Sequence, residues 1–394
     1  MERRHLAGHV VRGYKAVEEP ERKEFAGKMP AFHMFDLIII GAGPAGITAA
    51  HEAKQNGLSY LVIEKGLFGN TVYNYPVGLT VFSTTNELEI VPGGLKPARE
   101  KPTREELLSY YVRFVLEHEL NIQTEETVIS VTKVPRTPRS EPPALAGGRD
   151  GAFESTFVPP ANAGGSDRFT VVTDKGEYDA KNILFAIGAM DHPRKLNVPG
   201  EDLPKVHDTF RETYPWVKKK ALIVGGGNSA GEAALFLAEE GADTTLAIFR
   251  DDWENEDPKQ GCIKYWVKQP LQDELKKHCL KLFFLGKVIE IREDEVVLEN
   301  ESGETEILPN DVVFVLIGAD ADLTMLKSLG VETEIGKAGE VPVYDPETFE
   351  TNVPGIYVAG HFTHQRHIKG AIDAGRCSVV GLAERLRRGN AVTQ

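Results

Sequence analysis

The sequence predicts an α/β fold of two three-layer units, the second inserted into the first. The segments 41–50 (GAGPAGITAA) and 225–234 (GGGNSAGEAA) each follow a short aliphatic run and open an alanine-rich stretch. Aliphatic runs alternate with helical patterns, which is typical of parallel strands covered by helices. After residue 340 the pattern of the first unit returns, and this indicates that the second unit interrupts the first.

The first unit is predicted to begin with a buried strand at 35–40 (FDLIII), because the run is short, apolar and β-branched. A later helix at 103–120 is predicted to start at Thr103, with Glu106 completing a capping box. The other elements expected are helices at 44–56 and 370–388 and strands at 58–63, 126–134, 169–174, 181–187 and 355–359.

The inserted unit is predicted to start near residue 204. Its expected elements are strands at 220–224, at 244–249 and within 281–299, and helices at 228–240 and 271–278. A further buried strand is expected at 311–317, past the predicted end of this unit. The predicted limits are 34–203 and 307–394 for the outer unit, 204–306 for the inserted unit, and 1–33 for a disordered tail. Residues 135–167 are rich in Pro and Gly and nearly repeat PPALAGG as PPANAGG, so we expect a loose insertion there.

Composition narrows the class of protein. The 394 residues carry a net charge of −14, which argues against nucleic acid or an anionic membrane as partner. No apolar run approaches the roughly 20 residues of a membrane-spanning helix, and 1–33 lack a signal-peptide centre. The cysteines Cys262, Cys279 and Cys377 are far apart, which excludes a disulfide scaffold and favours a reducing cytoplasm.

The first glycine segment has the spacing of a dinucleotide-binding loop. Gly41 permits the tight turn, Gly43 lets a pyrophosphate approach the backbone, and Gly46 lets helix and strand pack closely. The helix that follows offers free N–H groups to the phosphates. Glu64 ends the next predicted strand, where a carboxylate accepts hydrogen bonds from ribose hydroxyls.

The second segment repeats the device with Gly225, Gly227 and Ala230. Arg250 stands where the first copy has Glu64, and an arginine there favours the 2′-phosphate of NADPH over NADH. Lys259 and Lys264 are near in sequence and can assist. The alternative is a solvated loop residue, since Asp251 and Asp252 follow directly.

Two such loops in one chain predict two redox dinucleotides. The usual arrangement places FAD in the split outer unit and a nicotinamide in the inserted one. Hydride then passes between the two rings, which requires ring contact and exclusion of water.

The stretch 350–386 (ETNVPGIYVAGHFTHQRHIKGAIDAGRCSVVGLAERL) resembles the closing motif of the thioredoxin reductase-like flavoproteins, and the resemblance extends over 34–390 apart from the insertion. It implies that Gly360 lies against the flavin side chain. It also implies a helix N-terminus pointing at the flavin pyrimidine, formed by Gly370, Ala371 and Ile372. His361 departs from the Asp usual in that group.

No C-x-x-C is present, so direct reduction of thioredoxin is not expected. Residues 69–90 and 101–111 resemble the bacillithiol-disulfide reductase branch, which has FAD and NADPH sites and reduces a low-molecular-weight disulfide. This implies that the flavin ring lies beside Asn70, Tyr75, Phe82, Ser83 and Thr84. Lys264 and Trp266 fit the branch's nicotinamide unit. The further cofactor contacts expected are Pro44, Ala45, Lys65, Val128, Ala186 and Gly188 for FAD, and Asn228 and Ser229 for the nicotinamide.

The branch's proposed active cysteine is replaced here by Ala45. The catalytic residue is therefore left open, with His361 and Cys377 as candidates. Cys377 is more readily interpreted as a packed core residue, and Cys262 and Cys279 as structural. His361, His364 and His367 are spaced three apart without a carboxylate or thiol, so we predict a pocket border and no metal site.

The sequence therefore predicts a cytoplasmic, homodimeric FAD-dependent NADPH oxidoreductase whose partner is a small-molecule or small redox-protein electron acceptor. A low-molecular-weight disulfide is the expected acceptor. Three alternatives stay open: a ferredoxin–NADP⁺ reductase, a flavin monooxygenase and a non-enzymatic flavin-binding protein. Rotation of the inserted unit is expected about linkers near 200–210 and 302–310.

Overall fold

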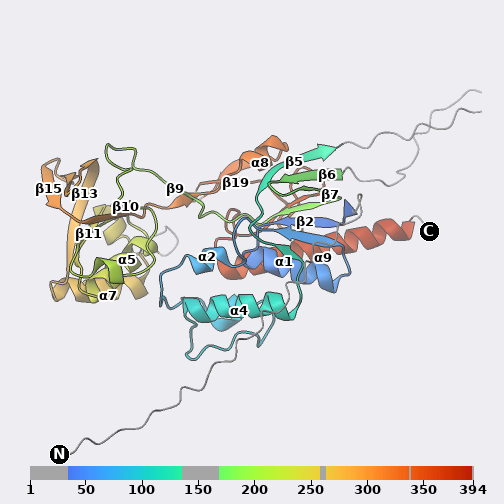
Figure 1. Cartoon of the computed structure of the whole chain (residues 1–394), viewed down its shortest axis with the longest axis horizontal. Coiled ribbons are helices and arrows are strands. Elements are labelled where there is room, and N and C mark those ends of the chain that lie inside the picture. The colour runs from blue at the N-terminus through green and yellow to red at the C-terminus, as the bar shows by residue number, and fades with distance from the viewer. Residues whose placement is uncertain (1–33, 135–167, 258–262, 337–338, 393–394) are drawn as a thin grey trace, which may run out of the picture. The chain divides into compact units, whose positions relative to one another are not determined.

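The structure, a computed structural model, describes residues 34–134, 168–257, 263–336 and 339–392 (Figure 1). The predictions for the tail, the repeat insertion, Lys259 and Cys262 lie outside these residues. Among the helices described, none combines the length and apolar character that crossing a bilayer requires.

A five-stranded parallel sheet forms the centre of the outer unit, in the order β20-β8-β2-β3-β4. Its strands are β2 (Leu37–Ile40), β3 (Tyr60–Ile63), β4 (Ile122–Gln123), β8 (Ile183–Phe185) and β20 (Ile356–Val358). Ile356 pairs with Ile183, and Ile183 with Ile38, so the last strand of the chain returns to the sheet that the first one started. The predicted interruption and return are visible in this pairing.

Both faces of this sheet are covered. Leu37 and Ile39 pack toward α1 (Pro44–Gln55), α4 (Arg104–Glu117) and α9 (Ile368–Val392), and Figure 1 shows α1 and α9 running together. Ile38 and Ile40 pack on the other face. There they meet a four-stranded sheet of β1 (Met34–Phe35), β7 (Glu177–Ala180), β6 (Arg168–Thr173) and β5 (Val128–Val134). The alternation follows from the two-residue period of a strand and produces the three predicted layers.

The start of α4 confirms a local prediction. The backbone N–H of Thr103 donates to Glu106 Oε2 at 2.8 Å, and the N–H of Glu106 donates to Thr103 Oγ1 at 3.2 Å. This reciprocal pair satisfies two N–H groups that the first turn leaves without helical partners. The helix begins at Arg104 for that reason.

The inserted unit is built on a seven-stranded sheet in the order β10-β16-β11-β12-β13-β14-β15. Its strands are β10 (Val206–His207), β11 (Lys220–Val224), β12 (Asp243–Ile248), β13 (Leu280–Ile291), β14 (Glu295–Asn300), β15 (Thr305–Pro309) and β16 (Val312–Val315). In the order of the sheet, β10, β16, β11, β12 and β13 are parallel to one another. The strands β13, β14 and β15 then form an antiparallel meander. One face packs against α5 (Asn228–Glu239) and α7 (Tyr265–Lys276).

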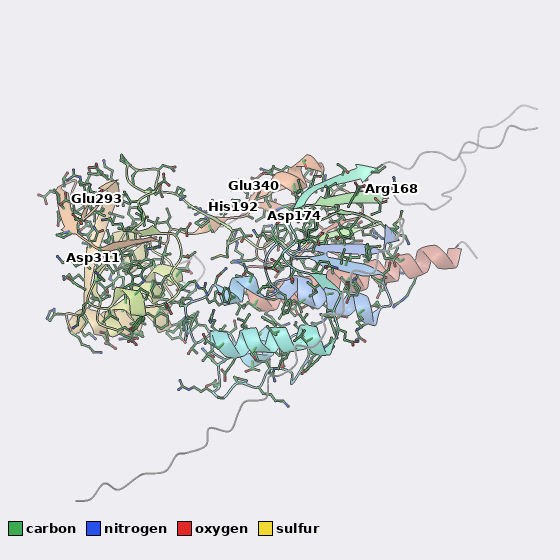
Figure 2. The ribbon with its side chains drawn as sticks, in the orientation of Figure 1. Arg168, Asp174, His192, Glu293, Asp311 and Glu340 are labelled. Carbon is green, nitrogen blue, oxygen red and sulfur yellow. The ribbon has the colours of Figure 1, made fainter. Side chains whose placement is uncertain are left out.

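The strand β16 lies beyond the limit predicted at residue 306. Leu222 and Ile223 of β11 pair with Val313 and Phe314, and Asp311, labelled in Figure 2, accepts the N–H of Lys220 at 2.7 Å. The sheet of the inserted unit therefore extends to residue 315. A limit at 306 misses this strand because an apolar run in sequence does not reveal which sheet receives it.

The segments expected to act as linkers, 200–210 and 302–310, contain the strands β10 and β15 of this sheet. The chain instead passes between the two sheets at β9 (His192–Pro193) and β17 (Ala319–Asp320), which pair with each other in antiparallel orientation. The linker prediction was therefore placed too far inside the inserted unit.

The helix predicted at 271–278 begins six residues earlier, at Tyr265, and contains Pro270. Proline lacks the N–H that would bond back to the preceding turn, so it normally marks a helix start or a break. Here Val267 and Leu271 are buried on one face of the same helix, and their packing holds the helix together across Pro270.

Candidate functional site

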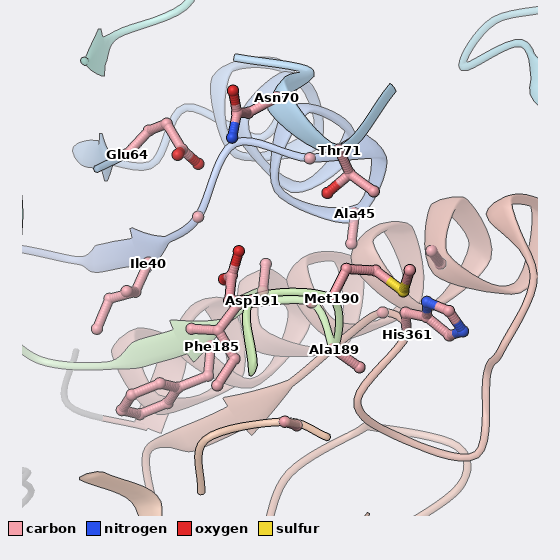
Figure 3. Close-up of a pocket in the computed structure, with 18 of the residues that line it drawn as sticks. Ile40, Ala45, Glu64, Asn70, Thr71, Phe185, Ala189, Met190, Asp191 and His361 are labelled. Atoms are coloured by element: carbon pink, nitrogen blue, oxygen red, sulfur yellow. The ribbon is translucent and has the colours of Figure 1, made fainter. Parts of the chain in front are cut away.

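A cavity of about 390 Å³ opens where the strands of the five-stranded sheet end (Figure 3). Ile40, Ile63 and Phe185, the last residues of β2, β3 and β8, lie in its wall. Ligands of open parallel sheets bind at the carboxyl ends of the strands, so this position is the expected one for a nucleotide.

The first glycine loop forms one side of this cavity with the predicted division of roles. Gly41 has a φ of +105°, and a Cβ there would collide with the carbonyl of Ala186. A Cβ on Gly46 would collide with the carbonyl of Gly41, whereas a Cβ on Gly43 would meet no atom within 4 Å. Gly41 and Gly46 therefore allow close packing of the backbone, and Gly43 leaves open space beside it. The helix α1 starts at Pro44 with no side-chain cap, so its first N–H groups remain available to phosphates.

Glu64 fixes the loop from the end of β3. Its Oε2 accepts the N–H of Ala42 at 2.7 Å and its Oε1 accepts the N–H of Gly66 at 2.8 Å, with 8% of the residue exposed. A carboxylate oxygen can accept more than one hydrogen bond, so each retains capacity for a ribose hydroxyl. Figure 3 shows the carboxylate beside the loop. These features fit the adenosine half of FAD.

Most of the predicted FAD contacts lie in the cavity wall. They are Gly41, Gly43, Pro44, Ala45, Glu64, Lys65, Asn70, Tyr75, Val128, Ala186, Gly188, Gly360, His361 and Ala371. Lys65 does not stand alone there, because its Nζ lies 2.8 Å from Asp191 Oδ2. Burial, together with the carboxylate of Glu232, raises the pKa of Tyr75, so its phenol stays protonated.

A second group of predicted contacts is placed elsewhere. Thr84 caps the short helix α3 (Thr85–Leu88), and its N–H donates to Glu87 Oε2 at 2.7 Å. The ring of Phe82 lies 4.8 Å from that of Trp266. Ile372, a residue of α9, is buried in the core. The predicted contacts outside the cavity wall are Gly46, Phe82, Ser83, Thr84, Gly370 and Ile372.

His361 and His367 lie in the wall, while His364 does not. Burial lowers the pKa of His361, and the charges of Arg366 and His367 lower it further, so the imidazole is neutral at neutral pH. His364 Nε2 instead contacts Glu334 Oε1 at 3.0 Å. The three histidines therefore do not converge on one point.

Cys377 is exposed, which corrects its interpretation as a packed core residue. On α9, Ser378 and Val379 face the core, whereas Cys377 and Glu384, seven positions later, lie on the exposed stripe of the helix. Cys377 is not in the cavity wall, so the wall does not support it as a catalytic residue. Cys279 is also exposed.

Several residues of the cavity wall belong to no sequence motif that would predict them. The structure adds Thr71, Glu126, Met190, Asp320 and Arg366 to the predicted set. Met190 and Asp191 follow Gly188, so proximity to a predicted contact was the available signal. Arg366 lies within the closing motif but outside its matched positions. Glu126 lies in a connection and Asp320 in the two-residue strand β17, and hydrophobic periodicity places neither.

The second glycine loop, between β11 and α5, repeats the geometry of the first. A Cβ on Gly225 would collide with the carbonyl of Leu316, and a Cβ on Gly227 would meet no atom within 4 Å. Ala230 is fully buried in the third position. Asn228 Oδ1 accepts the N–H of Lys264 at 2.8 Å, which ties the first turn of α5 to the start of α7. Ser229 is exposed in that turn.

Arg250 opens the short helix α6 (Arg250–Glu254) directly after β12. Its guanidinium lies over the ring of Phe284, 3.7 Å from the centroid. Nε and Nη2 donate to the two carboxylate oxygens of Glu301 at 2.7 and 2.5 Å, and Nη1 donates to Glu254 at 3.2 Å. Arg250 is therefore at the predicted place, but in the structure it is held in ion pairs.

Comparison with known proteins supports the nucleotide-binding arrangement. Residues 38–137 and 162–360 match the family model described as pyridine nucleotide-disulphide oxidoreductase. The chain is 33% identical over 323 residues to bacilliredoxin reductase Bdr of Bacillus subtilis (strain 168), covering 82% of this chain and 88% of that protein. It is 31% identical over 337 residues to a ferredoxin–NADP reductase of Ignicoccus hospitalis, covering 84% and 90%.

Among solved structures, the chain is similar to bacillithiol disulfide reductase Bdr from Staphylococcus aureus. The TM-score is 0.76 at 30% identity, over 90% of this chain and 99% of that one. A thioredoxin reductase from T. acidophilum, at 22% identity and a TM-score of 0.64, shares the fold. The predicted fold class and the predicted resemblance are both confirmed.

Proposed function

The chain belongs to the pyridine nucleotide-disulphide oxidoreductase family, and from this we propose how it uses its two glycine loops. It is an FAD-dependent NAD(P)H oxidoreductase. We propose that FAD occupies the loop and cavity of the outer unit, and that NADPH occupies the loop of the inserted unit. We propose a low-molecular-weight disulfide as the electron acceptor.

One observation supports this assignment most strongly: two loops of the same backbone design occur in one chain, and the first opens into a cavity. A Cβ would collide at Gly41 in the first loop and at Gly225 in the second, whereas at Gly43 and Gly227 it would meet open space. In a dinucleotide-binding loop, the open second position lets the pyrophosphate approach the backbone closely. The residues present therefore fit two dinucleotides.

Bound FAD supplies two-electron chemistry, accepting hydride from NADPH and passing electrons to an acceptor. The residues of the chain bind and orient the cofactor. The first turn of α1, whose N–H groups have no side-chain cap, would hold the pyrophosphate, and Glu64 would hold the ribose. Ala371, near the start of α9, brings the positive end of a helix dipole to the cavity, where it favours negative charge. His361, neutral at neutral pH, can hold or accept a proton on its imidazole beside the same space.

The acceptor chemistry differs from that of a thiol-dependent reductase. Ala45 lies in the wall where the resemblance expects a cysteine, and the described cysteines, Cys279 and Cys377, lie outside the wall. We infer that the enzyme thiol is dispensable and that the overall reaction is NADPH + H⁺ + RSSR → NADP⁺ + 2 RSH. Bound FAD would supply both electrons to the acceptor disulfide.

An anaerobic titration tests the proposal. Flavin-loaded protein is mixed with NADPH, bleaching is followed by absorbance, and then bacillithiol disulfide, other small disulfides and ferredoxin are added in separate samples. We expect rapid bleaching, and reoxidation by a small disulfide with two thiols formed per NADPH consumed. If neither NADPH nor NADH bleaches the flavin, the assignment of the two loops is wrong.

A second acceptor is favoured by one finding, the 31% identity to a ferredoxin–NADP reductase over most of both chains. Reoxidation by ferredoxin alone would assign the protein to that activity. The net charge of −14 weighs against it, because ferredoxins are commonly acidic and like charges slow their encounter. We also propose a homodimer in the cytoplasm, which sedimentation of the purified protein and fractionation of cells test.

A further inference from the structure

The ion pairs of Arg250 bear on which nicotinamide the second loop prefers. A guanidinium recognises a phosphate best when two of its N–H groups point at two oxygens in parallel. In this structure the Nε and Nη2 pair of Arg250 already makes that bidentate contact, with Glu301. The edge of the side chain most suited to a 2′-phosphate is therefore taken by a carboxylate of the same chain.

The contact is built into the sheet. Arg250 follows β12, and Phe284 lies on the neighbouring β13, where it pairs with Ile248. Glu301 follows β14, and its backbone N–H donates to the carbonyl of Phe284 at 3.1 Å. Three adjacent strands thus bring the guanidinium, the ring beneath it and the carboxylate to one place.

Charge at this place is unfavourable to a phosphate. Arg250 carries one positive charge, and Glu301 and Glu254 together carry two negative charges within hydrogen-bond distance. The guanidinium lowers the pKa of Glu301, so that carboxylate is ionised at neutral pH. A carboxylate oxygen of Asp252 also lies against Gly226 in the middle of the glycine loop. A phosphate monoester with a charge near −2 approaches a cluster of net negative charge.

We propose that Glu301 is a specificity-determining residue that limits the preference for NADPH over NADH by occupying the phosphate-binding edge of Arg250. Binding of NADPH has to displace Glu301 or accept a poorer contact with the guanidinium. Binding of NADH, which has a hydroxyl at the same position, requires neither. This inference rests on the proposed function, in which the second loop binds the nicotinamide cofactor.

The test is a binding measurement on the flavin-loaded protein with oxidised cofactors, which are not consumed. Dissociation constants for NADP⁺ and NAD⁺ are measured by calorimetry for the wild type and for Glu301→Gln, which keeps the shape and removes the charge. We expect Glu301→Gln to bind NADP⁺ about tenfold more tightly while NAD⁺ changes less than about twofold, as loss of one close charge at the surface implies. The pair 2′,5′-ADP and 5′-AMP should show the same difference, which places it at the 2′-phosphate.

Glu295→Gln is the matched control. Glu295 begins the same strand and accepts a hydrogen bond from another arginine, Arg292, at 2.7 Å, away from Arg250. Glu295→Gln should leave the dissociation constants of NADP⁺ and NAD⁺ unchanged. The flavin absorbance should be the same in every variant. An unchanged NADP⁺ to NAD⁺ ratio in Glu301→Gln, or an equal gain in Glu295→Gln, would overturn the inference while leaving the proposed function in place. If the wild type binds neither dinucleotide, the proposed function itself fails, and the inference fails with it.

Discussion

The two glycine loops share a backbone and differ in the charges placed around it. Gly41 and Gly225 are closely packed, and Gly43 and Gly227 face open space. In the outer unit the acid at the end of the second strand, Glu64, is buried and bonded to its own loop. In the inserted unit Arg250 is exposed, and its bidentate partner Glu301 is 51 residues away in sequence. Glycine spacing therefore specifies the loop that would bind the pyrophosphate, while contacts between distant residues determine what surrounds the adjoining ribose.

The helices that follow the loops differ in a second way. Seven residues after the first glycine, α1 has Thr48 and α5 has Glu232. Thr48 is fully buried, and its Oγ1 donates to the carbonyl of Pro44 at 2.7 Å. Burial raises the pKa of Glu232 to about 7. One helix therefore contains a satisfied neutral group where the other contains a carboxyl that is partly protonated at neutral pH.

The largest effect is expected at the third position of the glycine motif, which is Gly46 in the first loop and Ala230 in the second. Gly46→Ala places a Cβ against the carbonyl of Gly41, whereas the second loop already contains Ala230. We expect Gly46→Ala to lower the free energy of unfolding by about 3 kcal/mol or more and the flavin content of purified protein at least tenfold. Flavin absorbance and urea unfolding measure these changes.

Gly43→Ala is the control, because a Cβ there meets no atom within 4 Å. It should change the unfolding free energy by less than about 1 kcal/mol while still weakening flavin binding. Stoichiometric flavin in Gly46→Ala would show that the close packing in the first loop is not required.

The next largest effect is expected at Glu232, which should make the free energy of unfolding depend on pH, whereas the neutral Thr48 should not. A carboxyl whose pKa rises on folding binds more protons in the folded state, so the free energy of unfolding falls as pH rises from about 4.5 to about 7. Glu232→Gln removes this loss. We expect it to be more stable than the wild type at pH 8 by on the order of 3 kcal/mol, and nearly equal to it at pH 4. Urea unfolding across this range measures the difference.

Glu240→Gln, at the exposed end of the same helix, is the control for removing an acid. As a surface substitution, it should change the free energy of unfolding by no more than about 0.5 kcal/mol. A flat difference for Glu232→Gln would contradict the burial of an ionisable group at this position.

A smaller effect concerns the charge at the second loop. Arg250→Gln should raise the dissociation constant of NADP⁺ about tenfold and that of NAD⁺ less than twofold, because only the former carries the 2′-phosphate. Calorimetry on the flavin-loaded protein measures both. Arg292→Gln is a close match, since Arg292 also bonds two glutamates, Glu290 and Glu295. Equal losses in the two variants would mean that Arg250 does not contact the cofactor.

The smallest effect is expected at the cysteines. Because Cys279 and Cys377 are exposed and lie outside the cavity wall, Cys279→Ser and Cys377→Ser should keep kcat/KM for the small disulfide within about twofold. Steady-state turnover and thiol release measure this. A loss of tenfold or more in Cys377→Ser would restore a thiol to the mechanism.

The sequence was sufficient where a short motif determines its own structure. Gly41, Gly43 and Gly225 act through backbone geometry within a few residues, and Thr103 with Glu106 forms a local capping box. Glu64 could be predicted for the same reason, because the end of the second strand lies at a fixed place beside the loop.

The sequence was insufficient where distant segments meet. The partner of Arg250 is 51 residues away, and no local pattern indicates Glu301. The resemblance implies that Phe82 lies beside the flavin, and no local pattern indicates the contact of its ring with Trp266. Cys377 was interpreted from the general tendency of free cysteine to be buried, but the face of α9 that meets the core decides its exposure.

The paired crossing at β9 and β17 has a consequence for how such a protein is assembled from parts. The N–H of Arg194 donates to the carbonyl of Gly318 at 2.9 Å, so the segment between them leaves and re-enters the outer unit at neighbouring points. An insertion with adjacent ends adds a second module without separating the two halves of its host. The segment 194–318 is in this sense a cassette.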